Sequence, residues 1–144
     1  MPDASVGSGS EARADAIRRA RIGSFFDALT QGAFPHDLFA PDACFWTTAS
    51  GPVDPGLYLR VPAMLASIFP YGLAFTIDSL ILEGDRAAAE VRSHGRFDGD
   101  QVYANSYAFL FRFDGDRIAS VAEHFNPLRV PPTLAERMRA GLAG

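Results

Sequence analysis

The strongest constraint on the fold lies between Gln101 and Pro127. From Tyr103 to Phe113 every second residue is aromatic or asparagine, which is the two-residue period of a strand with one buried face. Asp114-Gly115 interrupts this alternation, and a second strand-like run follows from Arg117 to Phe125. An Asp-Gly pair between two alternating runs is a strong signal for a hairpin. The sequence therefore predicts an antiparallel hairpin with one aromatic face.

This aromatic face also carries polar groups, namely Tyr103, Asn105 and Tyr107. A buried amide needs hydrogen-bond partners, so a face used only for packing seldom holds one. Large apolar rings with a few polar groups are also typical of the lining of a ligand pocket. Two interpretations stay open: a pocket wall that continues to Phe109, or a core face whose polar tips reach the edge of the sheet.

Similar turns divide the preceding residues into two more strands, at 73–82 and 86–97. Connections this short join antiparallel neighbours, so we expect a four-stranded meander. Apolar spacing and capping signals predict helices from Ser10 to about Thr30, at 61–69 and at 133–142. Helices that precede a long antiparallel sheet indicate the α+β class, with the helices on one face of the sheet.

Two shorter segments precede the meander. Residues 44–48 are rich in strand formers, whereas 50–56 is rich in glycine and proline and is predicted to be a loop. Residues 1–9 are rich in small residues, and we expect them to be disordered. The remainder, 10–144, is long enough for one domain with a hydrophobic core.

Composition argues against several classes of partner and cofactor. The net charge is −4 and the only basic run lies in the first predicted helix, so nucleic acid is not an expected partner. No stretch approaches the roughly 20 apolar residues of a membrane span, and the N-terminus lacks the apolar core of a signal peptide. We therefore expect a cytoplasmic protein without a membrane partner. The histidines lack metal-ligand spacing and no glycine-rich phosphate loop follows a strand, so we expect no metal and no cofactor.

The order of elements and the final hairpin resemble the nuclear transport factor 2-like superfamily, in particular its SnoaL-like and ketosteroid isomerase-like branch. The resemblance covers roughly residues 12–127 and rests on the motif Tyr103-x-Asn105-x-Tyr107 and on the run from Glu123 to Asn126. It implies a cone-shaped, strongly curved antiparallel sheet, with helices covering its concave face around an apolar pocket. The superfamily includes isomerases, lyases, hydrolases, cyclases and non-enzymes, so the fold does not fix the reaction.

The resemblance also implies positions for individual residues. Glu123 lies where the epoxide hydrolases of the superfamily keep an inward-facing acid on the last strand, and Asn105 and Tyr107 lie on the pocket face of the neighbouring strand. Those hydrolases also need an Arg and an Asp two residues apart on the preceding strand. Here the matching positions hold Val91 and Ser93, or Arg92 and His94 in the register shifted by one residue. Neither is an Arg–Asp pair, so epoxide hydrolysis is disfavoured. The general base of the ketosteroid isomerases has no counterpart near Phe45 and Thr47.

The hairpin loop decides which residue of the last strand faces the pocket. A two-residue turn at Asp114-Gly115 places His124 on the aromatic face, whereas a three-residue loop with a bulge places Glu123 there. Val121 and Phe125 flank Glu123 on its own face, so burial favours Glu123 and leaves His124 as the alternative catalytic residue. A carboxyl group in an aromatic pocket is expected to have a raised pKa, which suits acid–base catalysis near neutral pH.

These inferences lead to one hypothesis: a cofactor-independent enzyme of isomerase, cyclase or lyase type that acts on a small hydrophobic carbonyl, polyketide-like, steroid-like or aromatic compound. Glu123 would exchange the proton, and Asn105 and Tyr107 would bind the carbonyl oxygen. The expected substrate-binding residues are Phe45, Trp46, Thr47, Tyr58, Ser93, His94, Tyr103, Phe109, Val121 and Phe125.

Two alternatives use the same fold without catalysis: a domain that only binds a small ligand, and a dimeric assembly domain. Relatives imply a homodimer formed through the outer face of the sheet. The short side chains expected on that face would let a second copy approach closely; they are Ala104, Ser106, Ala108, Ala119 and Ala122.

Overall fold

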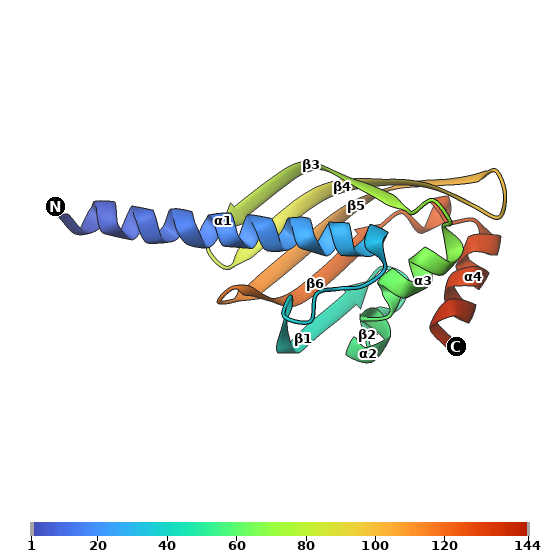
Figure 1. Cartoon of the computed structure of the whole chain (residues 1–144), viewed down its shortest axis with the longest axis horizontal. Coiled ribbons are helices and arrows are strands. Elements are labelled where there is room, and N and C mark those ends of the chain that lie inside the picture. Colours follow the sequence, from blue (N-terminus) through green and yellow to red (C-terminus); the bar gives the residue numbers. More distant parts are fainter. Residues whose placement is uncertain (1, 144) are drawn as a thin grey trace.

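A curved, unclosed sheet of six strands forms the centre of the protein, and helices cover one of its faces (Figure 1). The structure is a computed structural model that describes residues 2–143, with side chains from residue 9 onward. In chain order the elements are α1 (Pro2–Gln31), β1 (Phe39–Thr47), β2 (Gly51–Val53), α2 (Pro55–Tyr58), α3 (Val61–Ile68), β3 (Ala74–Glu83), β4 (Arg86–Phe97), β5 (Gln101–Asp114), β6 (Arg117–Phe125), the 3-10 helix η1 (Pro127–Arg129) and α4 (Pro132–Ala143). The predicted α+β class is confirmed.

The predicted meander is present, because β3, β4, β5 and β6 are neighbours in the sheet order β2-β1-β6-β5-β4-β3. The sequence did not show that β1 joins the free edge of this meander. β1 pairs with β6 in parallel, and the short β2 then pairs with β1 in the antiparallel sense. The strand that holds Glu123 is therefore an inner strand, flanked by β5 and β1.

Two predicted boundaries are corrected by the structure. The segment 50–56 is not simply loop, since Gly51 adopts a positive φ of 70° and the chain turns back to form β2. Pro52 is tolerated there because β2 is an edge strand, where a missing backbone donor leaves no gap in the sheet. Helix α1 begins at Pro2, before the predicted cap at Ser10. The side chains of residues 1–8 lie outside the described part, and the predicted disorder of 1–9 stays a prediction.

Helix α1 lies across the sheet and is held at two hairpin turns by Arg18. The Arg18 guanidinium donates to the carbonyl oxygens of Gly84 (2.6 Å) and Gly115 (3.3 Å), and it lies 5.6 Å from the centre of the Phe113 ring. Further along the helix, Phe25 packs edge-on against Phe109 of β5 with ring centroids 5.7 Å apart, and both side chains are buried. This contact confirms that the aromatic face of β5 is the helix-covered face.

Gly95 of β4 allows the chain between α3 and β3 to pass close above the sheet. A Cβ atom at this position would lie 2.9 Å from Leu73 Cδ1 and 3.0 Å from Phe69 Cδ1. Both of those side chains are buried, so neither has free space to move into. Gly95 therefore fixes how closely the helical layer approaches β4.

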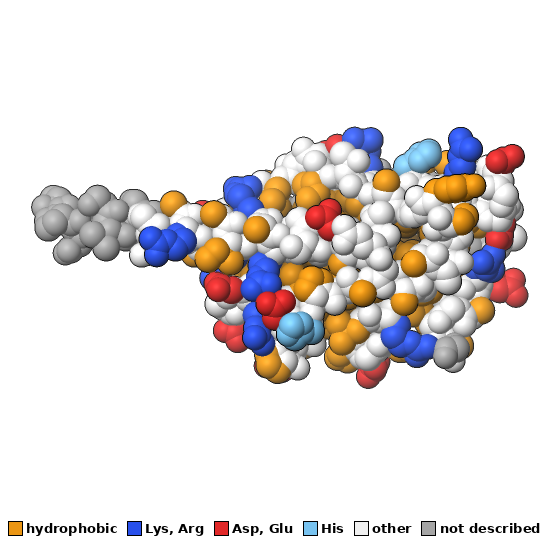
Figure 2. All heavy atoms as spheres, viewed as in Figure 1, with side chains coloured by type: hydrophobic (Ala, Val, Ile, Leu, Met, Phe, Trp, Pro, Cys, Tyr) orange, Lys and Arg blue, Asp and Glu red, His pale blue; other side chains and the backbone are white. Residues whose placement is uncertain are grey.

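The helical side of the molecule presents hydrophobic side chains between scattered groups of both charges, with no field of a single sign (Figure 2). Among the helices of the described residues, none is long and apolar enough to cross a membrane.

Candidate functional site

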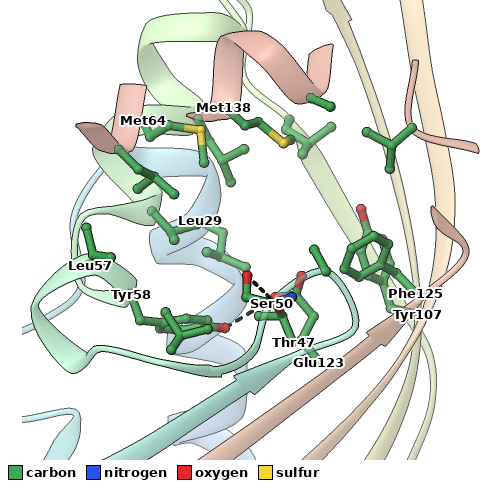
Figure 3. A pocket seen from close by; sticks show the side chains of 18 of the residues that line it. Leu29, Thr47, Ser50, Leu57, Tyr58, Met64, Tyr107, Glu123, Phe125 and Met138 are labelled. Atoms are coloured by element: carbon green, nitrogen blue, oxygen red, sulfur yellow. Dashed lines mark hydrogen bonds between the residues drawn. The ribbon is translucent and has the colours of Figure 1, made fainter. Parts of the chain in front are cut away.

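A cavity of about 450 Å³ lies between the sheet and the helices (Figure 3). Most of its lining is apolar, with Glu123, Tyr58, Tyr103 and Tyr107 among the few polar side chains. A volume in this range accommodates a small organic molecule. The lining residues are Leu29, Thr47, Ala49, Ser50, Val53, Leu57, Tyr58, Val61, Met64, Leu65, Leu73, Phe75, Tyr103, Tyr107, Phe109, Glu123, Phe125, Pro127, Val130, Ala135, Met138, Arg139 and Leu142.

A bulge in β6 turns Glu123 toward this cavity. Next to the turn, Asp114 pairs with Arg117 and Phe113 with Ile118, but beyond the register shift Arg112 pairs with Ser120. Ala119 is the extra residue, and it exchanges the two faces of the strand from that point on. The turn residues are Gly115 and Asp116, so the structure has neither the two-residue turn at Asp114-Gly115 nor the three-residue loop that the sequence suggested. The predicted outcome is nevertheless the observed one: Phe109 lies opposite Glu123.

The backbone of Glu123 is held from the side of β1. Thr48 N donates to the Glu123 carbonyl oxygen at 3.0 Å, and Phe125 N donates to Thr48 Oγ1 at 3.1 Å. Thr47, the last residue of β1, is the register partner of Glu123. These contacts fix the position from which the Glu123 side chain enters the cavity.

Tyr58 is the hydrogen-bond partner of the Glu123 carboxyl group. Its hydroxyl donates to Glu123 Oε1 at 3.3 Å (Figure 3). The Tyr58 ring stacks on Phe45 with centroids 4.3 Å apart. Burial raises the pKa of Glu123 to about 7, and the hydrogen bond from Tyr58 opposes this rise only in part. Burial also raises the pKa of Tyr58 well above its ordinary value, so Tyr58 stays a neutral donor.

A chain of hydroxyl groups from β4 and β5 lies on the same face of the sheet as Glu123 and forms the polar part of that wall. Tyr107 Oη lies 2.8 Å from Ser93 Oγ and 3.1 Å from Tyr103 Oη. Asn105 Nδ2 donates to Tyr103 Oη at 2.9 Å and to the Asn126 carbonyl oxygen at 3.0 Å. Both amide hydrogens of Asn105 are thus used inside the protein, and its oxygen accepts from Ser106 N at 2.8 Å.

Proton counting along this chain leaves one hydroxyl hydrogen for a ligand. Ser93, Tyr107 and Tyr103 supply three hydroxyl hydrogens, but only two hydrogen bonds join them. Ser93 is buried and has no other acceptor among the described residues, so leaving the free hydrogen on Ser93 would be costly. The free hydrogen therefore belongs to Tyr103 or Tyr107, which both line the cavity. Burial raises the pKa of both tyrosines, so both hydroxyls stay protonated.

Seven of the residues that the sequence singled out line the cavity, namely Thr47, Tyr58, Tyr103, Tyr107, Phe109, Glu123 and Phe125. Four others are buried nearby but do not line it, namely Asn105, Phe45, Ser93 and Val121.

Three predicted site residues lie on the outer face of the sheet instead. Trp46 and His124 pack against each other there, with ring centroids 4.7 Å apart, and His94 is exposed on β4. The cause is strand alternation, since each of them neighbours a residue that points inward, namely Phe45, Glu123 and Ser93. A placement of Trp46, His94 or His124 in the pocket wall is therefore corrected.

Sequence reasoning missed the part of the cavity that α4 builds. Ala135, Met138, Arg139 and Leu142 all line it. Positions 135, 138 and 142 keep the spacing of one helix face, which is the signal that could have pointed to them. Arg139 shares that face but is charged, so a search for apolar residues would pass over it.

Within the described residues, no group of three or more His, Cys, Asp or Glu side chains is placed to hold a metal ion.

Comparison with known proteins gives a family and a fold. The profile of the SnoaL-like domain matches residues 16–121, a range that ends before Glu123. Among solved structures, an NTF2-like protein from Anabaena variabilis has a TM-score of 0.69 at 22% identity and covers 78% of this chain and 89% of its own. AclR from Streptomyces galilaeus, a candidate hydroxylase, has a TM-score of 0.68 at 16% identity, covering 86% of this chain and 97% of its own.

A third similar structure is IdmH from Streptomyces antibioticus, a candidate polyketide cyclase. Its TM-score is 0.66 at 20% identity, and the match covers 88% of this chain and 99% of IdmH. At these identities the likeness shows the fold alone. Among curated proteins, none matches the chain.

Proposed function

Because the chain belongs to the SnoaL-like family, we propose that it is an acid–base enzyme of isomerase, cyclase or lyase type, acting on a small hydrophobic carbonyl compound in the cavity. One observation carries this proposal: the Glu123 carboxyl group enters an apolar cavity with a pKa of about 7, and the neighbouring strand of the same sheet face carries a hydroxyl chain with a free hydrogen. A base is most effective when its pKa lies near the working pH.

The geometry supports a division of roles between Glu123 on β6 and the tyrosine hydroxyls on β5. The Glu123 carboxylate would take a proton from the carbon next to a substrate carbonyl. The negative charge that then develops on the carbonyl oxygen would accept the free hydrogen of Tyr103 or Tyr107. Return of the proton from Glu123 to another carbon completes an isomerisation. Attack of the enolate carbon on a second carbonyl of the same molecule forms an alkoxide, and transfer of the Glu123 proton to that alkoxide completes a cyclisation.

The role of Asn105 in this proposal differs from the one expected from the sequence. Its amide is engaged by Tyr103, Asn126 and Ser106, and it does not line the cavity. Asn105 therefore positions Tyr103, so that the tyrosine hydroxyl and not the amide meets the substrate oxygen. His124, on the outer face, has no part in the reaction.

Deuterium exchange tests the proposal without knowledge of the natural substrate. Compact ketones such as 2-tetralone are incubated with the protein in D₂O, and loss of the proton signal next to the carbonyl is followed by NMR. We expect exchange above the buffer rate, with a loss of about 10²- to 10⁴-fold in Glu123→Gln. The matched control is His124→Gln, which should exchange as the wild type does. Binding of the ketones without any accelerated exchange would favour the non-catalytic alternative.

Association through the outer sheet face is a second, separate proposal. An apolar row crosses the strands there, because Ile81 pairs with Ala88, Ala88 with Leu110 and Leu110 with Ala122. Ile81 on the edge strand β3 and Leu110 on the inner strand β5 are 64% and 48% exposed, so the row leaves large apolar side chains open to solvent. The Arg86–Arg112 pair borders the row on one side and Glu90 on the other. A twofold axis along the row would therefore bring arginine to glutamate, which supports a homodimer.

A further inference from the structure

We infer that Arg139 of α4 recognises an anionic group, of the carboxylate class, at the end of the substrate that lies away from Glu123. Arg139 is the single positively charged side chain among the residues that line the cavity in the described part of the chain. The inference rests on the proposed function in one respect, that the cavity is the substrate site.

The placement of α4 brings Arg139 to the cavity. Leu134 is fully buried, and at Gly141 the helix approaches α3 so closely that a Cβ atom would lie 2.7 Å from Met64 Cγ. The burial of Leu134 and the close approach at Gly141 together show which face of α4 is turned toward the protein. Position 139 then falls on the same face as Ala135 and Leu142, four residues after the one and three before the other.

Packing alone does not explain an arginine at this position. The other residues of α4 that line the cavity are apolar, namely Ala135, Met138 and Leu142. Within residues 9–143, Arg139 has neither an ion pair nor a hydrogen bond, whereas Arg137 on the same helix pairs with Asp98. Arg139 is exposed as well as part of the cavity lining, so a ligand in the cavity can reach it.

Arg139 and Glu123 belong to opposite walls of the cavity. In Figure 3, Met138 of α4 lies across the open space from Glu123 on β6, and Arg139 belongs to the same helix and also lines the cavity. A ligand that spans this space meets the base and the tyrosine wall at one end and the guanidinium at the other. The planar guanidinium donates two parallel hydrogen bonds to a carboxylate, which matches that group better than a neutral one.

Three contacts together describe the substrate class. The ligand has a carbonyl oxygen toward Tyr103 or Tyr107, an acidic carbon toward Glu123 and a carboxylate toward Arg139. Apolar atoms fill the space between them. This corresponds to a compact hydrophobic keto acid and not to a wholly neutral molecule.

Binding of two matched probes tests this inference separately from catalysis. The probes are 1-naphthylacetate and its neutral counterpart 1-naphthylacetamide, titrated calorimetrically at pH 6, where Glu123 is mainly protonated. Because Arg139 is exposed and water weakens its interactions, we expect the wild type to prefer the acid by about three- to tenfold. Arg139→Gln should bind both probes equally, while Arg137→Gln, which removes the same charge from the same helix, should keep the preference.

Equal affinity of the wild type for both probes, a preference that survives in Arg139→Gln, or no binding of either probe would each overturn the inference. Thermal unfolding of the two variants shows whether α4 stays in place. Failure of the proposed acid–base function would show in the deuterium-exchange experiment, where Glu123→Gln would exchange as fast as the wild type. The preference for the acidic probe would not change in that case.

Discussion

Tyr58 Oη lies 3.3 Å from Glu123 Oε1, although the two residues are 65 positions apart in the chain. The short helix α2 supplies the donor and the inner strand β6 supplies the acceptor. Burial raises the pKa of Glu123 to about 7, and the hydrogen bond from Tyr58 lowers this pKa and so opposes the effect of burial.

Tyr58→Phe should raise the pKa of Glu123 above its wild-type value. The substitution removes the only contribution that lowers this pKa but keeps the ring stacked on Phe45. The pH midpoint of proton exchange should therefore move upward, and the rate at pH 7 should fall. Carbon NMR of protein labelled at the glutamate carboxyl reads the same pKa directly. A midpoint that stays in place or moves down would show that Tyr58 does not act on Glu123.

The stability of the protein should depend on pH through Glu123. The pKa rises from about 4.5 to about 7 on folding, so between these values the folded state holds a proton that the unfolded state has lost. The contribution is complete below pH 4.5 and disappears as the pH rises through 7. It is on the order of 3 kcal/mol at most. Thermal unfolding between pH 5 and pH 8 should show this decline in the wild type and a flatter curve in Glu123→Gln; parallel curves would contradict it.

Gly95→Ala should destabilise the fold by about 1–3 kcal/mol, because the new methyl group would press on Leu73 and Phe69. Gly23→Ala is the matched control. A Cβ at position 23 of α1 meets nothing within 4 Å, and alanine in a helix stabilises by roughly 0.5–1 kcal/mol relative to glycine. Urea denaturation distinguishes the two. Equal free energies of unfolding for Gly95→Ala and wild type would show that Leu73 and Phe69 can move away from the new methyl group at little cost.

Leu110→Glu should convert the proposed dimer to monomer, because it places a charge in the middle of the apolar row on the outer face. Gln101→Glu adds the same charge at the start of the strand and should leave association unchanged. Sedimentation velocity at micromolar concentration measures both variants. A wild-type protein that sediments only as a monomer would remove the dimer from the account.

The elements of the fold could be predicted from sequence because their signals are local. Alternation in β5 and the short acidic turns indicate the meander, and they do so without reference to distant residues. Gly51 and Pro52 look like loop residues by the same local rules, and they form an edge strand only because the end of β1 lies beside them. The parallel pairing of β1 with β6 likewise has no signature within either segment.

The part of the site on β5 was predictable, because the alternation of side chains along a strand decides which residues face the cavity. The parts that depend on contacts between distant elements were not predictable. The aromatic face of β5 could be read directly, but the side on which Glu123 lies depends on a bulge at Ala119, which no local signal marks. The sequence nevertheless predicted the inward position of Glu123, because Val121 and Phe125 on the same face are apolar and favour burial of that face. Tyr58, the hydrogen-bond partner of Glu123, comes from α2, and Arg139 comes from α4. Only tertiary packing brings these two residues to the cavity.

The most direct test is the pH dependence of deuterium exchange into a bound ketone, compared between wild type, Glu123→Gln and His124→Gln. Exchange by the wild type should rise with pH around a midpoint near 7, because only the ionised Glu123 can take the proton. His124→Gln should follow the same curve, and Glu123→Gln should lack the midpoint. If Glu123→Gln exchanges as fast as the wild type, or if the midpoint disappears in His124→Gln instead, Glu123 is not the base.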